Sequence, residues 1–225
     1  MIKTIFQKLL FASGKHYQID KDIPSKFFIK TIFVRVTMLL RGFIYCQKKA
    51  FLGSRTKLLN KRNIYLGKNS TISTRVIIDG YCKEKLIIGN NTKIGAYSEI
   101  SSTSHFSKYG KGFKIGSNSG VGKFAFFGAS GGIKIGNDVI MGEYVSFHSE
   151  NHNFSNPKQL IREQGVSSKG ILLGNNIWVG AKVTFLDGAE VGDNSVVAAG
   201  AVVKDKFPSN VVIGGVPAKI IKQIV

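Results

Sequence analysis

The sequence contains few of the residues that mark disulfide-stapled, secreted or metal-binding proteins. Its 225 residues include only two cysteines, Cys46 and Cys82, whose separation fits neither a metal site nor a redox motif. The N-terminus has no uninterrupted apolar core followed by a small-residue cleavage site, so no secretory signal is indicated. We therefore expect a cytoplasmic chain without a disulfide framework.

Acidic residues are also scarce. The chain has 13 Asp and Glu against 32 Lys and Arg, and residues 1–65 alone hold 14 basic and two acidic residues. Such a balance favours an anionic partner. No recognised nucleic-acid-binding motif accompanies the charge, so nucleic acid is not an expected partner. An acidic glycan or an anionic membrane surface fits better.

What the sequence does have is glycine, 26 residues of it, and a period of six. This period is typical of hexapeptide β-helix repeats, in which each apolar residue points inward and stacks on its equivalent in the next coil. Glycine often follows, as corners require. The period predicts an all-β parallel β-helix of about six coils over residues 64–215, and a β-sandwich with Gly-rich turns explains it poorly. The apolar triplets are Leu66/Ile72/Ile78, Ile88/Ile94/Ile100, Ile115/Val121/Phe127, Ile135/Met141/Phe147, Leu173/Val179/Phe185 and Val191/Val197/Val203.

The segment before the repeat, residues 1–63, is the basic part of the chain. Asp22 and Pro24 indicate a helix start, and residues 25–50 are predicted to form one apolar helix. Lys30, Arg35 and Arg41 interrupt it, which makes it a poor membrane span. Two roles remain open: peripheral contact of residues 24–50 with the anionic inner face of the membrane, or a cap on the open end of the β-helix.

The longest break in the repeat lies between Phe147 and Leu173 and predicts a protruding loop over residues 148–170. A loop of this length on a solenoid is more often functional than decorative. It contains His148, Glu150 and His152, and the only tryptophan, Trp178, follows it closely. We therefore expect the chemistry at this break.

Residues 135–222 resemble the hexapeptide acyltransferases, in particular the maltose/galactoside O-acetyltransferases and bacterial polysaccharide O-acetyltransferases. The resemblance implies a left-handed β-helix, acetyl-CoA as co-substrate, no metal, and a homotrimer whose active sites form between subunits. A short helix is expected over residues 216–225. The matching pieces are Asn151-His152-Asn153-Phe154, Arg162-Glu163-Gln164-Gly165, Ile177-Trp178-Val179-Gly180-Ala181, Ala198-Ala199-Gly200-Ala201-Val202-Val203 and Gly214-Gly215-Val216-Pro217-Ala218-Lys219.

The resemblance also implies roles for individual residues. His152 becomes the general base, a task suited to imidazole, and His148, Glu150 and Trp178 become candidates for catalytic support or acceptor contact. The implied CoA-binding residues are Trp178, Ala181, Ala199, Lys204, Asp205, Lys206, Lys219 and Lys222. The chain departs from the family at Lys204-Asp205-Lys206, where Lys206 is an alternative to Asp205.

The predicted function is transfer of acetyl from acetyl-CoA to a sugar hydroxyl in a bacterial surface polysaccharide or its precursor, without a covalent acyl-enzyme. Residues 124–132 lack the acidic residue expected for a free maltose-like acceptor, so an acidic or lipid-linked glycan fits better. An N-acyltransferase acting on an amino sugar or nucleotide sugar is the main alternative. A γ-carbonic-anhydrase-like enzyme needs three zinc-binding histidines, which the spacing of His105, His148 and His152 fits poorly, and a non-catalytic scaffold leaves the loop histidine without a role.

Overall fold

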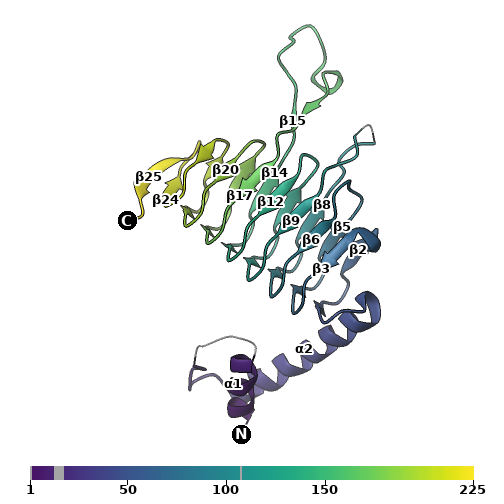
Figure 1. Ribbon diagram of the computed structural model, residues 1–225, viewed down its shortest axis with the longest axis vertical. Coiled ribbons are helices and arrows are strands. Elements are labelled where there is room, and N and C mark those ends of the chain that lie inside the picture. Colours follow the sequence, from purple (N-terminus) through teal and green to yellow (C-terminus); the bar gives the residue numbers. More distant parts are fainter. Residues whose placement is uncertain (1, 13–17, 107) are drawn as a thin grey trace.

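The computed structural model describes residues 2–12, 18–106 and 108–225, and it confirms the parallel β-helix. The chain winds into a three-sided prism with its two N-terminal helices along one side and one long loop projecting from the opposite side (Figure 1). Apart from the last pair of the first face, consecutive strands on each face are parallel and in register, so equivalent residues of successive coils stack.

The strands form three sheets, which we name the first, second and third faces. The first face has β1 (Phe51–Leu52), β4 (Thr71–Ile72), β7 (Lys93–Ile94), β10 (Gly120–Val121), β13 (Ile140–Met141), β18 (Trp178–Val179), β21 (Val196–Val197), β24 (Val211–Gly214) and β25 (Lys219–Gln223). The second face has β2 (Lys57–Leu59), β5 (Ile77–Asp79), β8 (Glu99–Ser101), β11 (Phe126–Gly128), β14 (Ser146–His148), β19 (Thr184–Leu186) and β22 (Val202–Val203). The third face has β3 (Ile64–Leu66), β6 (Leu86–Ile88), β9 (Phe113–Ile115), β12 (Ile133–Ile135), β17 (Ile171–Leu173), β20 (Glu190–Val191) and β23 (Lys206–Phe207).

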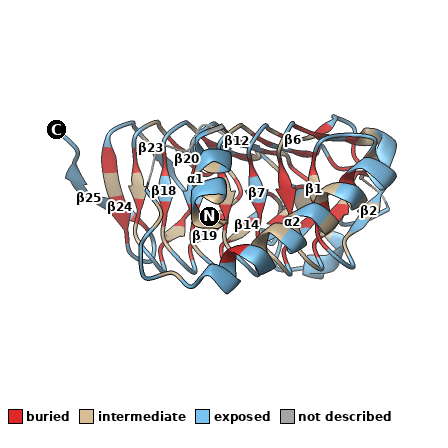
Figure 2. Ribbon diagram, turned by 90° about the horizontal axis from the view of Figure 1, so that it is seen from below, coloured by how far each residue is buried: buried red, intermediate tan, exposed pale blue. Residues whose placement is uncertain are grey.

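The core is a column of the repeating apolar residues, which are buried along the inside of every face (Figure 2). Under the loop it is aromatic. The Phe147 ring stacks between those of Phe127 and Phe185, with centroid distances of 4.9 and 4.4 Å, and all three side chains are fully buried. Strands as short as two or three residues bury only one or two apolar side chains each, and the core is continuous because each coil covers the next.

The prediction of about six coils starting at residue 64 was wrong by one coil. The second and third faces each hold seven strands, and the β-helix already begins at β1 and β2. Leu52 and Leu58 keep the six-residue spacing, but the next inward residue, Leu66, follows eight residues after Leu58, because a 3-10 turn, Lys61–Asn63, separates β2 from β3. Leu58, the inward residue of β2, is also only partly buried at this end of the prism.

The predicted C-terminal helix over residues 216–225 was also wrong. Residues Lys219–Gln223 form β25, which pairs antiparallel with β24. The segment Ile220-Ile221 is β-branched and favours an extended chain, and pairing satisfies the backbone groups that β24 would otherwise expose at the end of the first face.

The N-terminal helices are α1 (Ile2–Ala12) and α2 (Ser25–Cys46), and α2 lies against β1 at the end of the prism (Figure 2). The Arg35 guanidinium stands 3.6 Å from the centroid of the Phe51 ring and donates a 2.9 Å hydrogen bond to Thr71 Oγ1. Burial of this group lowers the pKa of Arg35. Helix α2 is therefore packed on the first strands of the prism. Among the described residues, no helix is long and apolar enough to cross a membrane.

Candidate active site on the projecting loop

The projecting loop leaves the prism after β14 and returns at β17, at the corner between the second and third faces. Its base is a short antiparallel hairpin of β15 (Asn151–His152) and β16 (Val166–Ser167), in which His152 pairs with Val166. The parallel sheet cannot supply this pairing, so the hairpin gives the loop its own backbone hydrogen bonds away from the prism (Figure 1).

Two buried polar side chains fix the two roots of the loop. At the start, Ser149 Oγ donates to the carbonyl oxygen of Gly128 at 2.7 Å and accepts from the N–H of Gly131 at 2.9 Å. At the end, the Asp187 carboxylate accepts from the N–H of Lys169 at 2.7 and 3.0 Å and from the N–H of Gly170 at 2.8 Å. Asp187 is only 8% exposed, so these are strong, sheltered hydrogen bonds.

The tip of the loop closes on Gln164. Its amide nitrogen donates to the carbonyl oxygens of Asn156 and Gln159, at 2.9 and 2.8 Å, and its amide oxygen accepts from the N–H of Asn156 at 3.0 Å. Asn153 adds a bond to the Gln164 carbonyl oxygen at 3.0 Å. The loop is therefore internally bonded at both tip and base, and the hairpin at the base keeps His152 at a defined position.

His152 is exposed, and within the described part of the chain no group hydrogen-bonds or pairs with its ring. Glu150, a candidate to orient it, points elsewhere: its carboxylate accepts from Ser104 Oγ at 2.9 Å and lies 3.8 Å from Lys108 Nζ. His148 ends β14 with its ring centroid 5.7 Å from that of Phe126. No group of three or more metal-ligating side chains occurs among the residues that the structure describes.

The residues expected to bind CoA fall into two places. Trp178 is exposed on the first face, between Ile140 and Val196. Ala181 and Ala199 follow at the corner between the first and second faces, where the turns pack so closely that a Cβ on Gly180 would lie 2.5 Å from the nitrogen of Ala199. Small side chains at this corner leave the main chain open to a ligand.

The charged residues expected to bind CoA also lie in two separate places. Lys219 and Lys222 are exposed on β25 at the end of the first face. Lys204 and Asp205 instead lie between β22 and β23, at the corner of the second and third faces. Lys206 pairs with Glu190 at 2.6 Å, so its charge is already partnered within the chain.

One chain therefore does not bring His152 together with Ala181 and Ala199, because the loop and the alanines occupy different corners of the prism. Sequence reasoning also missed Ser149 and Asp187. Asp187-Gly188 follows Phe185 as an ordinary turn pair, and nothing in the sequence indicates that its carboxylate reaches back to residues 169 and 170.

Comparison with known proteins agrees with the fold. Residues 170–205 match the family model "Bacterial transferase hexapeptide (six repeats)". The Galactoside O-acetyltransferase of Escherichia coli K12 is 35% identical over 92 residues, which cover 41% of this chain and 44% of that protein. WbbJ of the same strain, whose name proposes an O-acetyl transferase of lipopolysaccharide biosynthesis, is 26% identical over 171 residues, covering 73% and 74%.

A solved structure shows the same fold. A variant of AntD, an N-acyltransferase from Bacillus cereus in complex with dTDP and coenzyme A, aligns with a TM-score of 0.58 at 21% identity, covering 77% of this chain and 86% of that one. The chain is therefore similar to the hexapeptide-repeat transferases, and it has the β-helix fold of their solved structures. It spans less than half the length of the galactoside enzyme and about three quarters of WbbJ.

Proposed function

We propose that the protein is an acetyl-CoA-dependent O-acetyltransferase that acts on a sugar hydroxyl of a bacterial surface polysaccharide or its precursor. The observation that carries the proposal is His152, which is exposed on a hairpin anchored by Ser149 and Asp187 and unpaired within the described chain. An imidazole held in this way is free to meet a substrate hydroxyl. The O-acetyltransferase named among the relatives supports the reaction class.

In this mechanism His152 accepts the proton of the acceptor hydroxyl while the oxygen attacks the acetyl thioester carbon. The carbon–sulfur bond of the resulting tetrahedral intermediate then breaks, and the imidazolium returns its proton to the departing thiolate. Backbone N–H groups at a neighbouring corner are suited to stabilise the oxyanion. Both substrates are bound together, so no residue of the chain needs to carry the acyl group.

The acetyl-CoA surface in this proposal includes Trp178, Ala181 and Ala199, with Lys219 and Lys222 available to the phosphates. These side chains are exposed along the first face and its corner, and the alanines admit a ligand to the main chain. His152 lies at the opposite edge of the second face. We therefore propose a homotrimer in which the loop of one chain reaches the acetyl-CoA surface of the next.

The acceptor in this proposal is a glycan near the inner face of the membrane. One side of α2 packs on the prism, while the other side exposes large apolar residues such as Phe33 (70%) and Ile44 (72%) beside basic residues. A helix of this kind fits the surface of an anionic bilayer. Co-sedimentation with vesicles of anionic phospholipid, but not with zwitterionic vesicles, is expected, and equal recovery from both would contradict the contact.

The activity is tested by incubating the full chain with acetyl-CoA and a panel of bacterial oligosaccharides while free thiol is measured. We expect His152→Ala to lower the rate by about 10²–10⁴-fold, whereas His105→Ala, the histidine control outside the hairpin, keeps it. A product that survives mild base is an amide and would favour N-acyl transfer, since acetyl esters hydrolyse. Thiol release that His152→Ala leaves unchanged rules out this base.

A further inference from the structure

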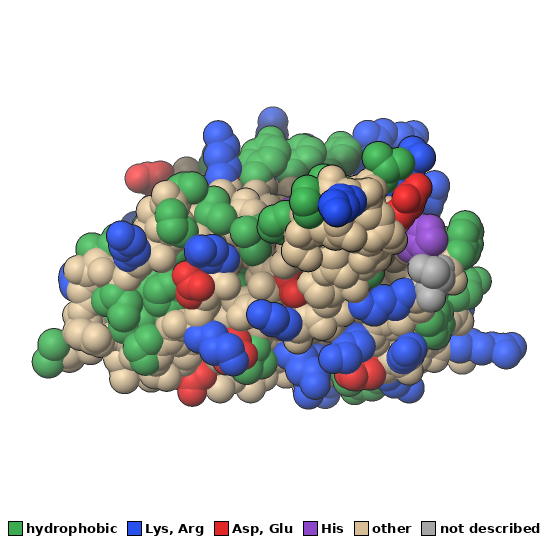
Figure 3. Space-filling view, turned by 90° about the horizontal axis from the view of Figure 1, so that it is seen from above, with side chains coloured by type: hydrophobic (Ala, Val, Ile, Leu, Met, Phe, Trp, Pro, Cys, Tyr) green, Lys and Arg blue, Asp and Glu red, His purple; other side chains and the backbone are tan. Residues whose placement is uncertain are grey.

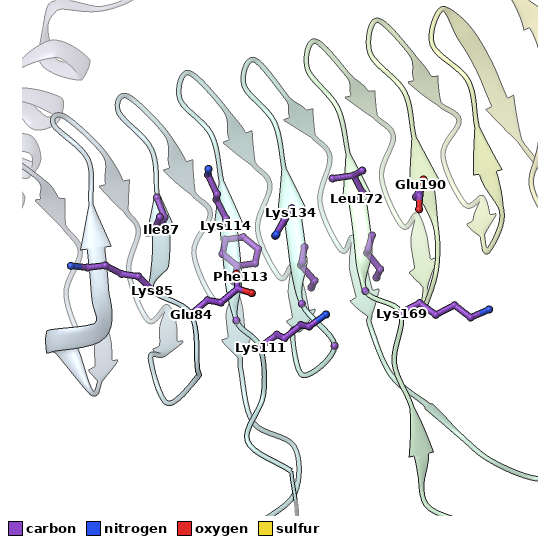
Figure 4. A pocket seen from close by; sticks show the side chains of 16 residues that line it. Glu84, Lys85, Ile87, Lys111, Phe113, Lys114, Lys134, Lys169, Leu172 and Glu190 are labelled. Carbon is purple, nitrogen blue, oxygen red and sulfur yellow. The ribbon is translucent and has the colours of Figure 1, made fainter.

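The third face carries a basic groove that takes no part in the proposed acetyl transfer. The groove has a volume of about 510 Å³ and crosses β6, β9, β12, β17 and β20 (Figure 4). Five lysines line it, against the two carboxylates of Glu84 and Glu190. The lysines are Lys85, Lys111, Lys114, Lys134 and Lys169.

The charge of this groove is not neutralised within the chain. None of the five lysines forms an ion pair with a carboxylate among the described residues, and Glu190 is already paired with Lys206, which lies outside the groove lining. Lys114 and Lys134 are register partners on adjacent strands, about 4.8 Å apart as neighbouring strands are. Like charges placed directly opposite destabilise a sheet, so this pair favours an external anion.

Two further lysines are positioned by glycines. Gly132 and Gly188 have φ of +96° and +86°, and the Cβ that each lacks would lie 3.2 Å from the side-chain Cδ of Lys111 and Lys169 respectively. The left-handed backbone and the missing side chain let both lysine stems lie across the corner. Figure 4 shows these two lysines at the loop-side ends of the strands and Lys114 and Lys134 along the face.

The groove begins at the C-terminal end of the projecting loop. Lys169 and Gly170 line the groove and are the residues whose N–H groups Asp187 binds. On the other side, Lys108 joins Ser168 at 2.7 Å and Glu150 at 3.8 Å, which ties the loop to the segment leading to Lys111. On the side from which the loop projects, Lys and Arg side chains visibly outnumber acidic ones (Figure 3).

We infer that this groove binds a stretch of glycan bearing carboxylate or phosphate groups, away from the sugar that His152 acetylates. The apolar side chains of Ile87 and Leu172 between the lysines offer surface to the sugar rings. This inference rests on the proposed glycan acceptor, but it concerns binding and does not require acetyl transfer to be observed. It assigns the acceptor to the class of acidic polymers.

The test uses the full chain and two polymers, polygalacturonate for carboxylate and poly(glycerol phosphate) for phosphate, with neutral dextran as reference. Lys114→Glu/Lys134→Glu is compared with Lys57→Glu/Lys93→Glu, which makes the same charge change on exposed strand positions of the other faces. We expect the groove variant to weaken binding of at least one acidic polymer about tenfold or more in 50 mM salt. The control variant and the affinity for CoA should stay within about twofold of the wild type, a shift of less than 0.5 kcal/mol.

The two acidic polymers decide which anion the groove prefers. Binding of neither, or binding that the groove variant retains, overturns the inference. Equal loss in both variants overturns it as well, because overall charge would then explain binding. If the groove variant keeps polymer binding but dissociates an oligomer in sedimentation, the face is an interface between copies, and the inference fails. Failure of acetyl transfer with intact, groove-dependent binding would instead count against the proposed function alone.

Discussion

Replacing Asp187 should release the C-terminal root of the loop. Its carboxylate is 8% exposed and accepts from two backbone N–H groups, those of Lys169 and Gly170. Hydrogen bonds to a charged group contribute about 1.5–3 kcal/mol each. Water can reach part of this corner in the variant, so we expect Asp187→Ala to cost about 2–4 kcal/mol. Asp187→Asn should cost only about 1 kcal/mol, because Oδ1 alone already contacts both donors.

Urea unfolding followed by the fluorescence of Trp178 measures the loss of stability, and hydrogen exchange at residues 169–170 locates it. A local loss of 2–4 kcal/mol corresponds to exchange that is faster by about 30- to 1,000-fold. Acetyl transfer should fall with it, since His152 loses a fixed position.

Asp193→Ala is the matched control. Asp193 also accepts a backbone N–H, that of Asn175 at 2.6 Å, but it lies at a corner away from the loop. The control should therefore leave exchange at residues 169–170 unchanged. The reasoning is refuted if Asp187→Ala unfolds within about 0.5 kcal/mol of the wild type and keeps its slow exchange at these two amides.

Three further predictions concern packing and thiol chemistry. Gly42→Ala should separate α2 from the prism and lower the unfolding free energy by about 1–3 kcal/mol, because the added Cβ would lie 1.8 Å from the carbonyl oxygen of Ala50. Limited proteolysis should then cut α2 faster, and cleavage as slow as in the wild type would contradict this. Phe147→Ala should lower the unfolding free energy by about 3–5 kcal/mol, since the ring is fully buried between two others, and a loss below 1 kcal/mol in urea would show that the aromatic column is not needed. Burial raises the pKa of the Cys82 thiol, so fewer thiolates exist at pH 8 and a disulfide reagent should modify it only after unfolding. Burial also raises the pKa of the Cys46 thiol, and the nearby charges of Lys61 and Lys48 partly offset this. Cys46 is only half-buried, so it should react before Cys82 in the folded protein. Equal reaction rates of the two thiols in the folded protein would refute this order.

The regular part of the fold was predictable because the apolar residue at each repeat position contacts the equivalent residue of the next coil. An apolar residue every sixth position specifies its inward direction and its stacking partner at once, as Phe127, Phe147 and Phe185 show. The first coil was missed because only two of its residues, Leu52 and Leu58, carry the six-residue spacing, and the turn at Lys61–Asn63 separates them from Leu66. At the C-terminus the need to cover the edge of β24 decided the structure, and a local pattern does not contain that information.

The position of the projecting loop was predictable, because the break in the repeat after Phe147 located it. The role that the resemblance gives to His152 stays a prediction. The polar anchors were not predictable, because Asp187 binds residues 17 and 18 positions earlier. The basic groove escaped for the same reason: Lys111, Lys134 and Lys169 are far apart in sequence and become neighbours only when the coils stack.

The covered ends of the first face have a consequence for how copies of this protein associate. Helix α2 lies over β1, and β25 runs antiparallel beyond β24 and presents Lys219 and Lys222 along the outermost strand. A charged, antiparallel edge is a poor template for the parallel strands of another prism. Stacking of prisms into an endless fibre, the inherent hazard of a solenoid, is thereby opposed on this face.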